Sequence, residues 1–349
     1  MSFQEEKRES IKRYMLDKIR EDDKEYIKKT VENFGISVTT VKRYVKECLD
    51  REIICESDVC RCGHALSSEE IEFQYDTKSF LSEDRIFFED IRPLLKKVSK
   101  ESLNIWGYAF TEIMNNAIEH SGATQIFCRV KTDALYTEIV ITDDGIGIFQ
   151  KVKEYLQEKE GRETDTQDAL TELYKGKFTT NKSSHSGEGI FFTSKVLREF
   201  AIWSDENILV SGSYKKEHLV SSHLISYYTK LLHIGTMVVM KLENSTNRSI
   251  KEVFDMFAPL EEGFVRTVIP LKEVCPYGEP IARSQARRIV YRLEEFKYVE
   301  FDCSGIEFMG QGFADEIFRV FQNKYPNIEL SLTNANTTVA GMVQHVKKS

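Results

Sequence analysis

The stretch Glu112-Ile-Met-Asn-Asn116-Ala-Ile-Glu-His120 decides the fold, because it closes a segment with strong helical periodicity. From Glu101 to His120, apolar side chains recur at helical spacing, which predicts a helix with one buried face. Glu112 and Asn116 are one turn apart and share a different face of that helix. The apolar side chains of the buried face are Trp106, Phe110, Ile113, Met114, Ala117 and Ile118.

The paired polar residues suggest a metal and phosphate site. The carboxamide oxygen of Asn116 can ligate Mg²⁺, a cation held by few protein oxygens together with substrate phosphates. From the preceding turn, Glu112 can activate an attacking water or hydroxyl near a terminal phosphate. The alternative is that both are solvated polar residues on an amphipathic helix, and the helix alone does not decide between the two.

A second stretch, Asp143-Asp-Gly145-Ile-Gly147, follows two predicted strands, Gln125 to Val130 and Tyr136 to Thr142. Their alternation and the short turn between them favour a hairpin, which places Asp143 at a strand end. A carboxylate there can accept a hydrogen bond from an exocyclic amino group such as that of adenine. Gly145 and Gly147 let the backbone approach the base. The alternative is a glycine-rich turn that only closes the hairpin.

A third stretch, Ser186-Gly187-Glu-Gly189-Ile190, precedes the apolar run Ile190 to Leu197, which is typical of a helix start. Backbone amides at such a terminus bind anions. Between Phe149 and Ser186 we expect a long polar segment with one short helix, Thr166 to Tyr174. A loop of this length inside a compact domain is usually functional, and we interpret it as a lid over a nucleotide.

In this order and spacing, the three stretches resemble the GHKL superfamily of ATPases and kinases, and most closely its anti-sigma-factor kinase branch. The resemblance covers about residues 75–243 and implies a Bergerat α/β sandwich with ATP and Mg²⁺ as cofactors. It implies that Glu112 is the general base, Asn116 the magnesium ligand and Asp143 the adenine contact. The further nucleotide-binding residues that it implies are Gly145, Gly147, Lys182, Gly187, Gly189 and Thr236.

Residues 1–65 are predicted to be helical and to resemble a helix-turn-helix or winged-helix domain. The expected helices are Glu5 to Ile19, Lys24 to Phe34 and Val38 to Leu49, the last with Ser37 as its N-cap. In such domains the last helix enters the major groove of DNA. We expect Val38, Val41 and Val45 to face inward, and the DNA contacts to be Thr39, Thr40, Arg43 and Lys46. The alternative is a three-helix interaction or dimerisation domain.

Residues 250–349 alternate between predicted strands and helices, which favours a small α/β layer. The segment from Val299 through Gly310-Gln311-Gly312 to Phe318 resembles the core of STAS domains, particularly a STAS-like family found together with GHKL ATPases. In phosphorylatable antagonists of this fold a serine opens the helix, whereas the tripeptide here has no hydroxyl. We therefore expect a docking or sensing role toward a protein partner or a second protomer, with a homodimer as one such arrangement.

Composition limits the partners further. The 349 residues include 48 basic and 56 acidic side chains, with a net charge of -8, so any DNA contact must be local to residues 1–60. No apolar run is long enough to span a bilayer, and we expect a cytoplasmic protein without a membrane partner. The seven cysteines are typical of reduced thiols. Cys55, Cys60, Cys62 and His64 could hold zinc, or be thiols in a short hairpin.

These features favour an ATP-binding regulator in which nucleotide occupancy controls a DNA-binding module and a STAS-like module. Two alternatives stay open. One is a protein serine/threonine kinase of the anti-sigma type, and the other is an ATP-dependent machine that acts on DNA. A two-component histidine kinase is disfavoured, because no helical hairpin with an acceptor histidine precedes the predicted pocket.

Overall fold

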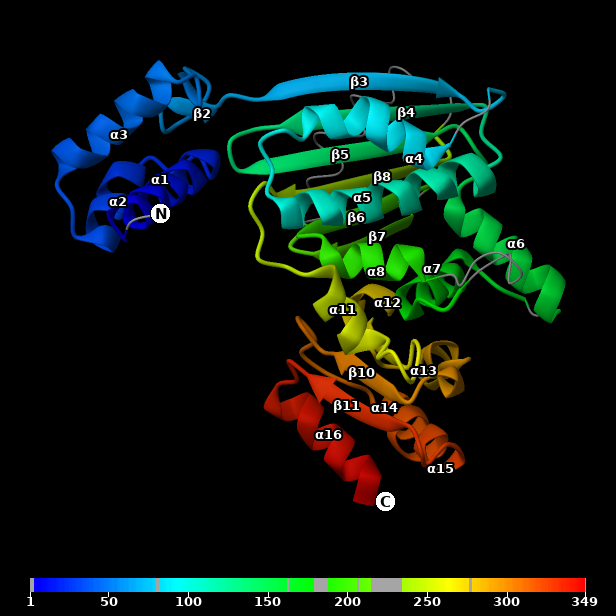
Figure 1. Cartoon of the computed structure of the whole chain (residues 1–349). Helices are drawn as coiled ribbons and strands as arrows, with labels where there is room; N and C mark the ends of the chain where they lie inside the picture. Colours follow the sequence, from blue (N-terminus) through cyan, green and yellow to red (C-terminus); the bar gives the residue numbers. More distant parts are fainter. Residues whose placement is uncertain are drawn as a thin grey trace.

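The computed structural model describes residues 3–79, 82–161, 163–178, 188–205, 207–214, 234–275 and 278–348 (Figure 1). It has three units. A small helical module at the N-terminus lies beside one end of a central sheet, and a C-terminal α/β unit lies against the helices that cover the sheet. The fold is therefore the multidomain α/β arrangement that the sequence predicts.

The N-terminal module contains three helices and a hairpin: α1 (Phe3–Arg20), α2 (Tyr26–Phe34), α3 (Val38–Asp50), β1 (Ile54–Glu56) and β2 (His64–Leu66). Gly35 ends α2 in the left-handed conformation, and the Ser37 hydroxyl accepts a hydrogen bond from the Thr40 amide to start α3. Val41 and Val45 are buried as expected. The prediction for Val38 is wrong, because its side chain is 48% exposed at the first turn of the helix.

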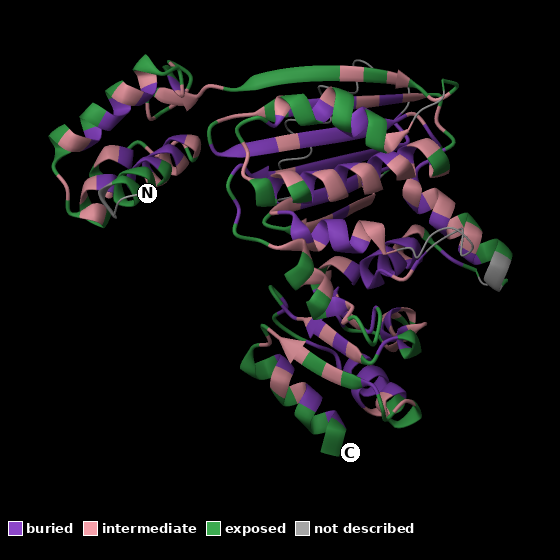
Figure 2. Ribbon diagram, in the orientation of Figure 1, coloured by how far each residue is buried: buried purple, intermediate pink, exposed green. Residues whose placement is uncertain are grey.

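The central sheet is antiparallel throughout, with strand order β3-β4-β5-β8-β6-β7. It begins at Glu69, ahead of the predicted domain start at residue 75. Figure 2 shows that β5 and β8 are mostly buried, whereas the end strand β3 is exposed along most of its length. The strands are β3 (Glu69–Asp76), β4 (Gln125–Thr132), β5 (Tyr136–Asp143), β6 (Glu199–Ser204), β7 (Asn207–Gly212) and β8 (Thr236–Glu243).

Helices cover one face of this sheet. Near its start are the short turns α4 (Glu83–Ile86), η1 (Phe87–Ile91) and η2 (Arg92–Leu94), followed by α5 (Lys100–Asn115), whose last turn widens into a π-helix, η3 (Asn116–His120). The expected long loop after residue 149 is wrong in its first half, because α6 (Ile148–Glu160) occupies it. One face of this helix is buried, and it carries Phe149, Val152 and Leu156. The predicted short helix is present as α7 (Thr166–Lys175), and α8 (Gly189–Val196) follows.

The C-terminal unit is a three-stranded parallel sheet, order β11-β10-β9, with helices packed on it. Helix α13 is short, and Arg292, which follows it, takes a left-handed backbone conformation. The elements are α11 (Ile250–Phe257), β9 (Arg266–Pro270), α12 (Leu271–Val274), α13 (Arg283–Val290), η6 (Leu293–Glu295), β10 (Tyr298–Asp302), α14 (Gln311–Asp315), η7 (Glu316–Phe321), α15 (Gln322–Lys324), β11 (Glu329–Thr333) and α16 (Thr337–Lys348).

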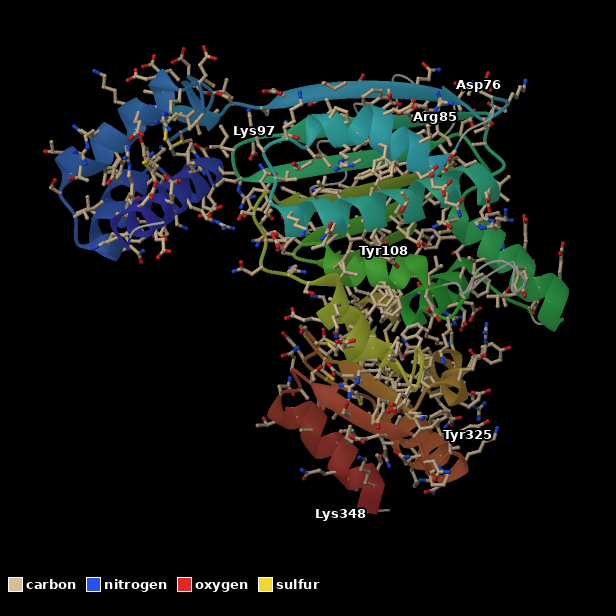
Figure 3. All side chains as sticks on the ribbon, in the orientation of Figure 1. Asp76, Arg85, Lys97, Tyr108, Tyr325 and Lys348 are labelled. Atoms are coloured by element: carbon tan, nitrogen blue, oxygen red, sulfur yellow. The ribbon has the colours of Figure 1, made fainter. Side chains whose placement is uncertain are left out.

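One hydrophobic core runs from the helical layer of the central unit into the C-terminal unit. Aromatic rings join the two. Phe192 of α8 stacks on Phe254 of α11 with ring centroids 4.0 Å apart, and Phe191 packs against Phe264, 4.8 Å away. Tyr108 of α5, labelled in Figure 3, meets Phe254 edge-on. The N-terminal module has a separate core, which includes Leu135 and Tyr136 of the central unit.

Within the part of the chain that the structure describes, every helix is too short or too polar to cross a membrane.

Candidate functional site

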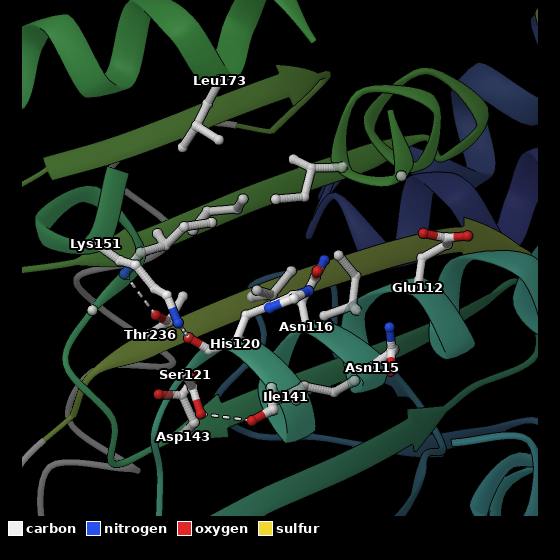
Figure 4. Close-up of a pocket in the computed structure, with 18 of the residues that line it drawn as sticks. Glu112, Asn115, Asn116, His120, Ser121, Ile141, Asp143, Lys151, Leu173 and Thr236 are labelled. Atoms are coloured by element: carbon white, nitrogen blue, oxygen red, sulfur yellow. Dashed lines mark hydrogen bonds between the residues drawn. The ribbon is translucent and has the colours of Figure 1, made fainter. Parts of the chain in front are cut away.

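A cavity of about 280 Å³ lies between the helical layer and the central strands (Figure 4). It brings together six residues predicted from sequence to act in one site: Glu112, Asn116, Asp143, Gly147, Gly189 and Thr236. The other lining residues that matter below are Asn115, His120, Ser121, Lys151, Leu173 and Phe178.

The floor of the cavity is formed by the ends of two neighbouring strands. Asp143 is the last residue of β5 and pairs in register with Thr236, the first residue of β8. The Asp143 side chain is only 4% exposed, and its Oδ1 accepts a hydrogen bond from the Gly145 amide at 2.9 Å. The Thr236 hydroxyl accepts a hydrogen bond from the Ile148 amide at 3.1 Å, which fixes the start of α6.

The two glycines after Asp143 have different surroundings. Gly145 does not line the cavity, because it packs on the Ser121 carbonyl, with which a Cβ atom would collide. Gly147 does line the cavity, at a φ of +87°, and a Cβ there would lie 2.5 Å from the Ser204 hydroxyl. Both positions require glycine because the chain packs closely on itself.

Glu112 faces the start of α8 across the cavity. A Cβ atom on Gly189 would collide with the Glu112 carboxylate, so the missing side chain keeps the two elements in contact. Asn116 is the first residue of the π-helical turn that ends α5, a deviation that often occurs at functional sites. Around this carboxylate the environment is poorly solvated. Burial raises the pKa of Tyr108, and the charges of Glu112 and Glu188 raise it further. Burial also raises the pKa of Glu188, although the nearby Lys177 ammonium acts in the opposite direction.

Several lining residues were not predicted. Lys151 on α6 reaches the cavity, and its ammonium donates a hydrogen bond to the His120 carbonyl at the end of η3. Leu173 on α7 and Phe178 after it form an apolar wall. The spacing of Phe149, Val152 and Leu156 is the signal that could have revealed α6 and with it Lys151.

Two predicted residues, Lys182 and Gly187, lie outside the described residues. The four predicted DNA contacts are on α3. Thr39, Arg43 and Lys46 are exposed and Thr40 is half-buried, and none of them lines the cavity.

Cys55, Cys60, Cys62 and His64 lie in and around the hairpin β1–β2. His64 Nδ1 is 3.2 Å from the Tyr26 hydroxyl, and the Cys62 thiol donates to the His64 carbonyl. Among the described residues, no group of three or more histidine, cysteine or acidic side chains is arranged to hold a metal ion.

The comparisons with known proteins agree with this geometry. Residues 106–223 match the family described as histidine kinase-, DNA gyrase B-, and HSP90-like ATPase, which is a domain match of GHKL type. Residues 285–340 match a STAS-like domain of unknown function. A comparison with curated proteins gives no match.

The residues present fit the magnesium nucleotide that this family implies. Asp143 presents a buried acceptor of the kind that an amino group requires. Asn116, which lines the same cavity, offers an oxygen of the type that Mg²⁺ prefers. Gly189 leaves the wall beside Glu112 without a side chain.

Proposed function

We propose that this protein is an ATP-dependent regulator, in which Mg-ATP in the central cavity controls DNA binding by the N-terminal module and docking by the STAS-like domain. The observation that carries this proposal is the convergence of Glu112, Asn116, Asp143 and Thr236 on one cavity of a GHKL-type domain.

Each residue has a distinct task. Asn116 holds the magnesium ion through its carboxamide oxygen, and Asp143 accepts a hydrogen bond from the adenine amino group. Glu112 orients and deprotonates a water or hydroxyl nucleophile. When bound, Mg-ATP supplies a terminal phosphoryl group that a nucleophile in this position can accept.

The central strands offer a route from the cavity to the N-terminal module. β5 and β8 carry Asp143 and Thr236 at their cavity ends, and Tyr136 and Glu243 at their opposite ends. At that opposite end the Arg20 guanidinium of α1 lies 4.3 Å from the Tyr136 ring centroid. Arg13 donates to the Ser245 carbonyl at 3.4 Å. A nucleotide that binds two arrangements of this contact unequally shifts the population between them.

The surface of α3 supports the DNA-binding part of the proposal. Glu47, an acid on this helix, is neutralised by Arg8 at 2.6 Å and Lys12 at 3.0 Å, both from α1. Arg43 and Lys46 are exposed, as basic contacts to phosphates require.

The central experiment is to incubate the pure protein with ATP labelled in its terminal phosphate, with and without duplex DNA, and to separate free phosphate from labelled protein. Free phosphate supports an ATPase switch or a DNA-engaged machine, and stimulation by DNA favours the machine. Label on a serine or threonine supports the kinase. If nucleotide binds without either product, the protein is a binding-only switch; if it does not bind, the proposal is wrong.

The DNA part is tested by Arg43→Ala and Lys46→Ala. Each lost phosphate contact should weaken duplex binding and reduce the slope of log K against log salt by about 0.9. Lys324→Ala, an equal charge change on α15, is the matched control and should leave both quantities unchanged. If the ATP-loaded protein has no salt-sensitive affinity for any DNA fragment, the N-terminal module is an interaction module instead.

A further inference from the structure

Helix α7 lies between the cavity and the C-terminal unit. On one side Leu173 forms part of the cavity wall, and Phe178, just after the helix, continues it. The other side packs against β9, α12 and α13 of the C-terminal unit. One short segment therefore contacts both the ATP-binding cavity and the STAS-like domain.

Two arginines of the C-terminal unit hold α7 from this second side. Arg288 of α13 forms ion pairs with Asp165 at 2.9 Å and with Asp168 at 3.1 Å. These two aspartates form the capping box that begins α7. Arg292 lies 3.5 Å from the Glu172 carboxylate in the last turn. Both ends of the helix are thus tied to the same neighbouring unit.

A buried lysine of α7 lies at the contact with the C-terminal unit. The Lys175 side chain is 2% exposed, and its ammonium lies 2.5 Å from Glu172 and donates to the Tyr291 carbonyl at 2.6 Å. The backbone is also bonded, since the Thr267 hydroxyl donates to the Lys175 carbonyl at 3.0 Å. Because the Tyr291 carbonyl and the Thr267 hydroxyl of the C-terminal unit satisfy polar groups of this buried residue, the geometry of α7 depends on that unit.

We infer that the STAS-like domain is an intramolecular clamp on α7 and sets the nucleotide affinity of the cavity in the same chain. The inference rests on the proposed function, because it concerns regulation of that ATP site. When Arg288 and Arg292 hold α7, Leu173 and Phe178 form a wall ready to receive the nucleotide. When the clamp is released, only a fraction of the molecules has this wall. The apparent affinity is then the intrinsic affinity multiplied by that fraction. By linkage, nucleotide binding strengthens the clamp to the same degree.

This mode of docking differs from the one expected at Gly310-Gln311-Gly312. Those residues begin α14 and lie beside Arg283 and Ile281 within the C-terminal unit. A Cβ atom on Gly310 would collide with the Ile281 carbonyl, so this glycine serves packing inside the unit. The surface that contacts α7 is formed instead by β9, α12 and α13, together with Arg292 after α13.

The test compares the full-length wild type with the double variant Arg288→Gln/Arg292→Gln. The matched control is Arg287→Gln, on the same helix, whose guanidinium pairs with Glu316 inside the C-terminal unit at 3.2 Å. The probe is a magnesium complex of a non-hydrolysable ATP analogue. Calorimetry gives its affinity, and hydrogen exchange measured by mass spectrometry reports protection of residues 165–175 and 283–290 with and without the analogue.

We expect the double variant to bind the analogue about tenfold more weakly, within the coupling range usual between two sites, while the control binds as the wild type does. In the wild type, the analogue should protect residues 283–290 from exchange, and this protection should vanish in the double variant. If the double variant does not fold, the single variant Arg288→Gln should show the same changes at smaller size.

Equal affinities for all folded variants, or no nucleotide-dependent protection of residues 283–290 in the wild type, would overturn the clamp. Failure of the wild type to bind the analogue at all would instead overturn the proposed function. The two failures are therefore distinguishable.

Discussion

At the scale of single residues, Glu112 and Asn116 share one helix face yet have different neighbours. Glu112 lies against Gly189 of α8, whereas Asn116 begins the π-helical turn. We predict that Asn116→Ala abolishes magnesium-dependent ATP binding. Glu112→Gln keeps the shape that contacts Gly189, so it should spare binding and lower turnover by about 10²- to 10⁴-fold.

Calorimetry measures the binding and phosphate release measures the turnover. Glu112 is not the base if its glutamine variant is folded and loses affinity and turnover together.

Two adjacent aspartates provide an internal comparison at the same scale. Asp143 is at the cavity floor, while Asp144 accepts hydrogen bonds from the Thr124 and Gln125 amides at 2.7 and 2.9 Å. We predict that Asp143→Asn weakens ATP binding by about 1–3 kcal/mol, because a donor replaces an acceptor oxygen in a buried contact. Asp144→Asn should lower stability and leave the affinity unchanged. Unchanged affinity in Asp143→Asn would mean that this residue only shapes the turn.

Sequence reasoning at this scale succeeded where the partners are close in sequence. Glu112 and Asn116 are on one helix, and Asp143 ends a strand whose alternation is clear. Lys151, Leu173 and Phe178 reach the cavity only through the packing of α6 and α7, which local pattern does not specify. The close packing of Gly145 on the Ser121 carbonyl is likewise a long-range contact that the motif alone does not specify.

At the scale of elements, α1 and α3 are joined by a charged contact whose pH dependence can be predicted. Hydrogen bonds from Arg8 and Lys12 lower the pKa of Glu47 to about 2. A carboxylate with a lowered pKa stabilises the fold fully above its ordinary value, about 4.5 in the unfolded chain. This stability is lost as the pH falls from that value toward 2.

We therefore predict that the N-terminal module loses stability between about pH 4.5 and 2, and that Glu47→Gln removes much of this dependence. The measurement is denaturant unfolding followed by circular dichroism at several pH values. The matched control is Glu32→Gln, an exposed position on α2, which should follow the wild-type curve. Identical pH dependence for Glu47→Gln and wild type would contradict the assignment.

The elements also show why helix α6 was not predicted. The charged residues of the segment from 150 to 160 suggested a loop, although three apolar side chains at helical spacing were present. Capping signals such as Ser37 and the Asp165–Asp168 pair are local, and the helices that they begin were predicted well. Val38 was misjudged because a residue in the first turn lacks the neighbouring turn that would cover it.

At the scale of the whole molecule, the distribution of cores predicts how the protein unfolds. The central and C-terminal units share one hydrophobic core, whereas the N-terminal module has its own. We predict two calorimetric transitions, the larger for the shared core and the smaller for the module. A saturating Mg-ATP analogue should raise the midpoint temperature of only the larger transition. At a concentration a hundredfold above Kd, the stabilisation of the shared core should be about 2.7 kcal/mol.

The variant Ile11→Ala identifies the smaller transition. Ile11 is buried in the N-terminal core, and its truncation should cost about 2–5 kcal/mol there while leaving the larger transition in place. A third transition that disappears when residues 266–349 are deleted would show that the C-terminal unit unfolds independently. That result would contradict the prediction that the central and C-terminal units unfold together.

Sequence identified the three units but not how they meet. The contacts between Arg288 and Asp168, or between Phe192 and Phe254, join residues far apart in the chain, and no local periodicity encodes them. The order of strands in the central sheet is likewise a long-range property, because β8 inserts between β5 and β6.

The exposed end strand β3 has a practical consequence for handling the protein. A sheet edge is a template on which another molecule's strand can add, and such edges are commonly protected by charge. β3 carries Glu69, Glu70 and Glu72 along this edge. High salt screens that charge, so buffers of modest ionic strength preserve the repulsion that keeps concentrated samples dispersed.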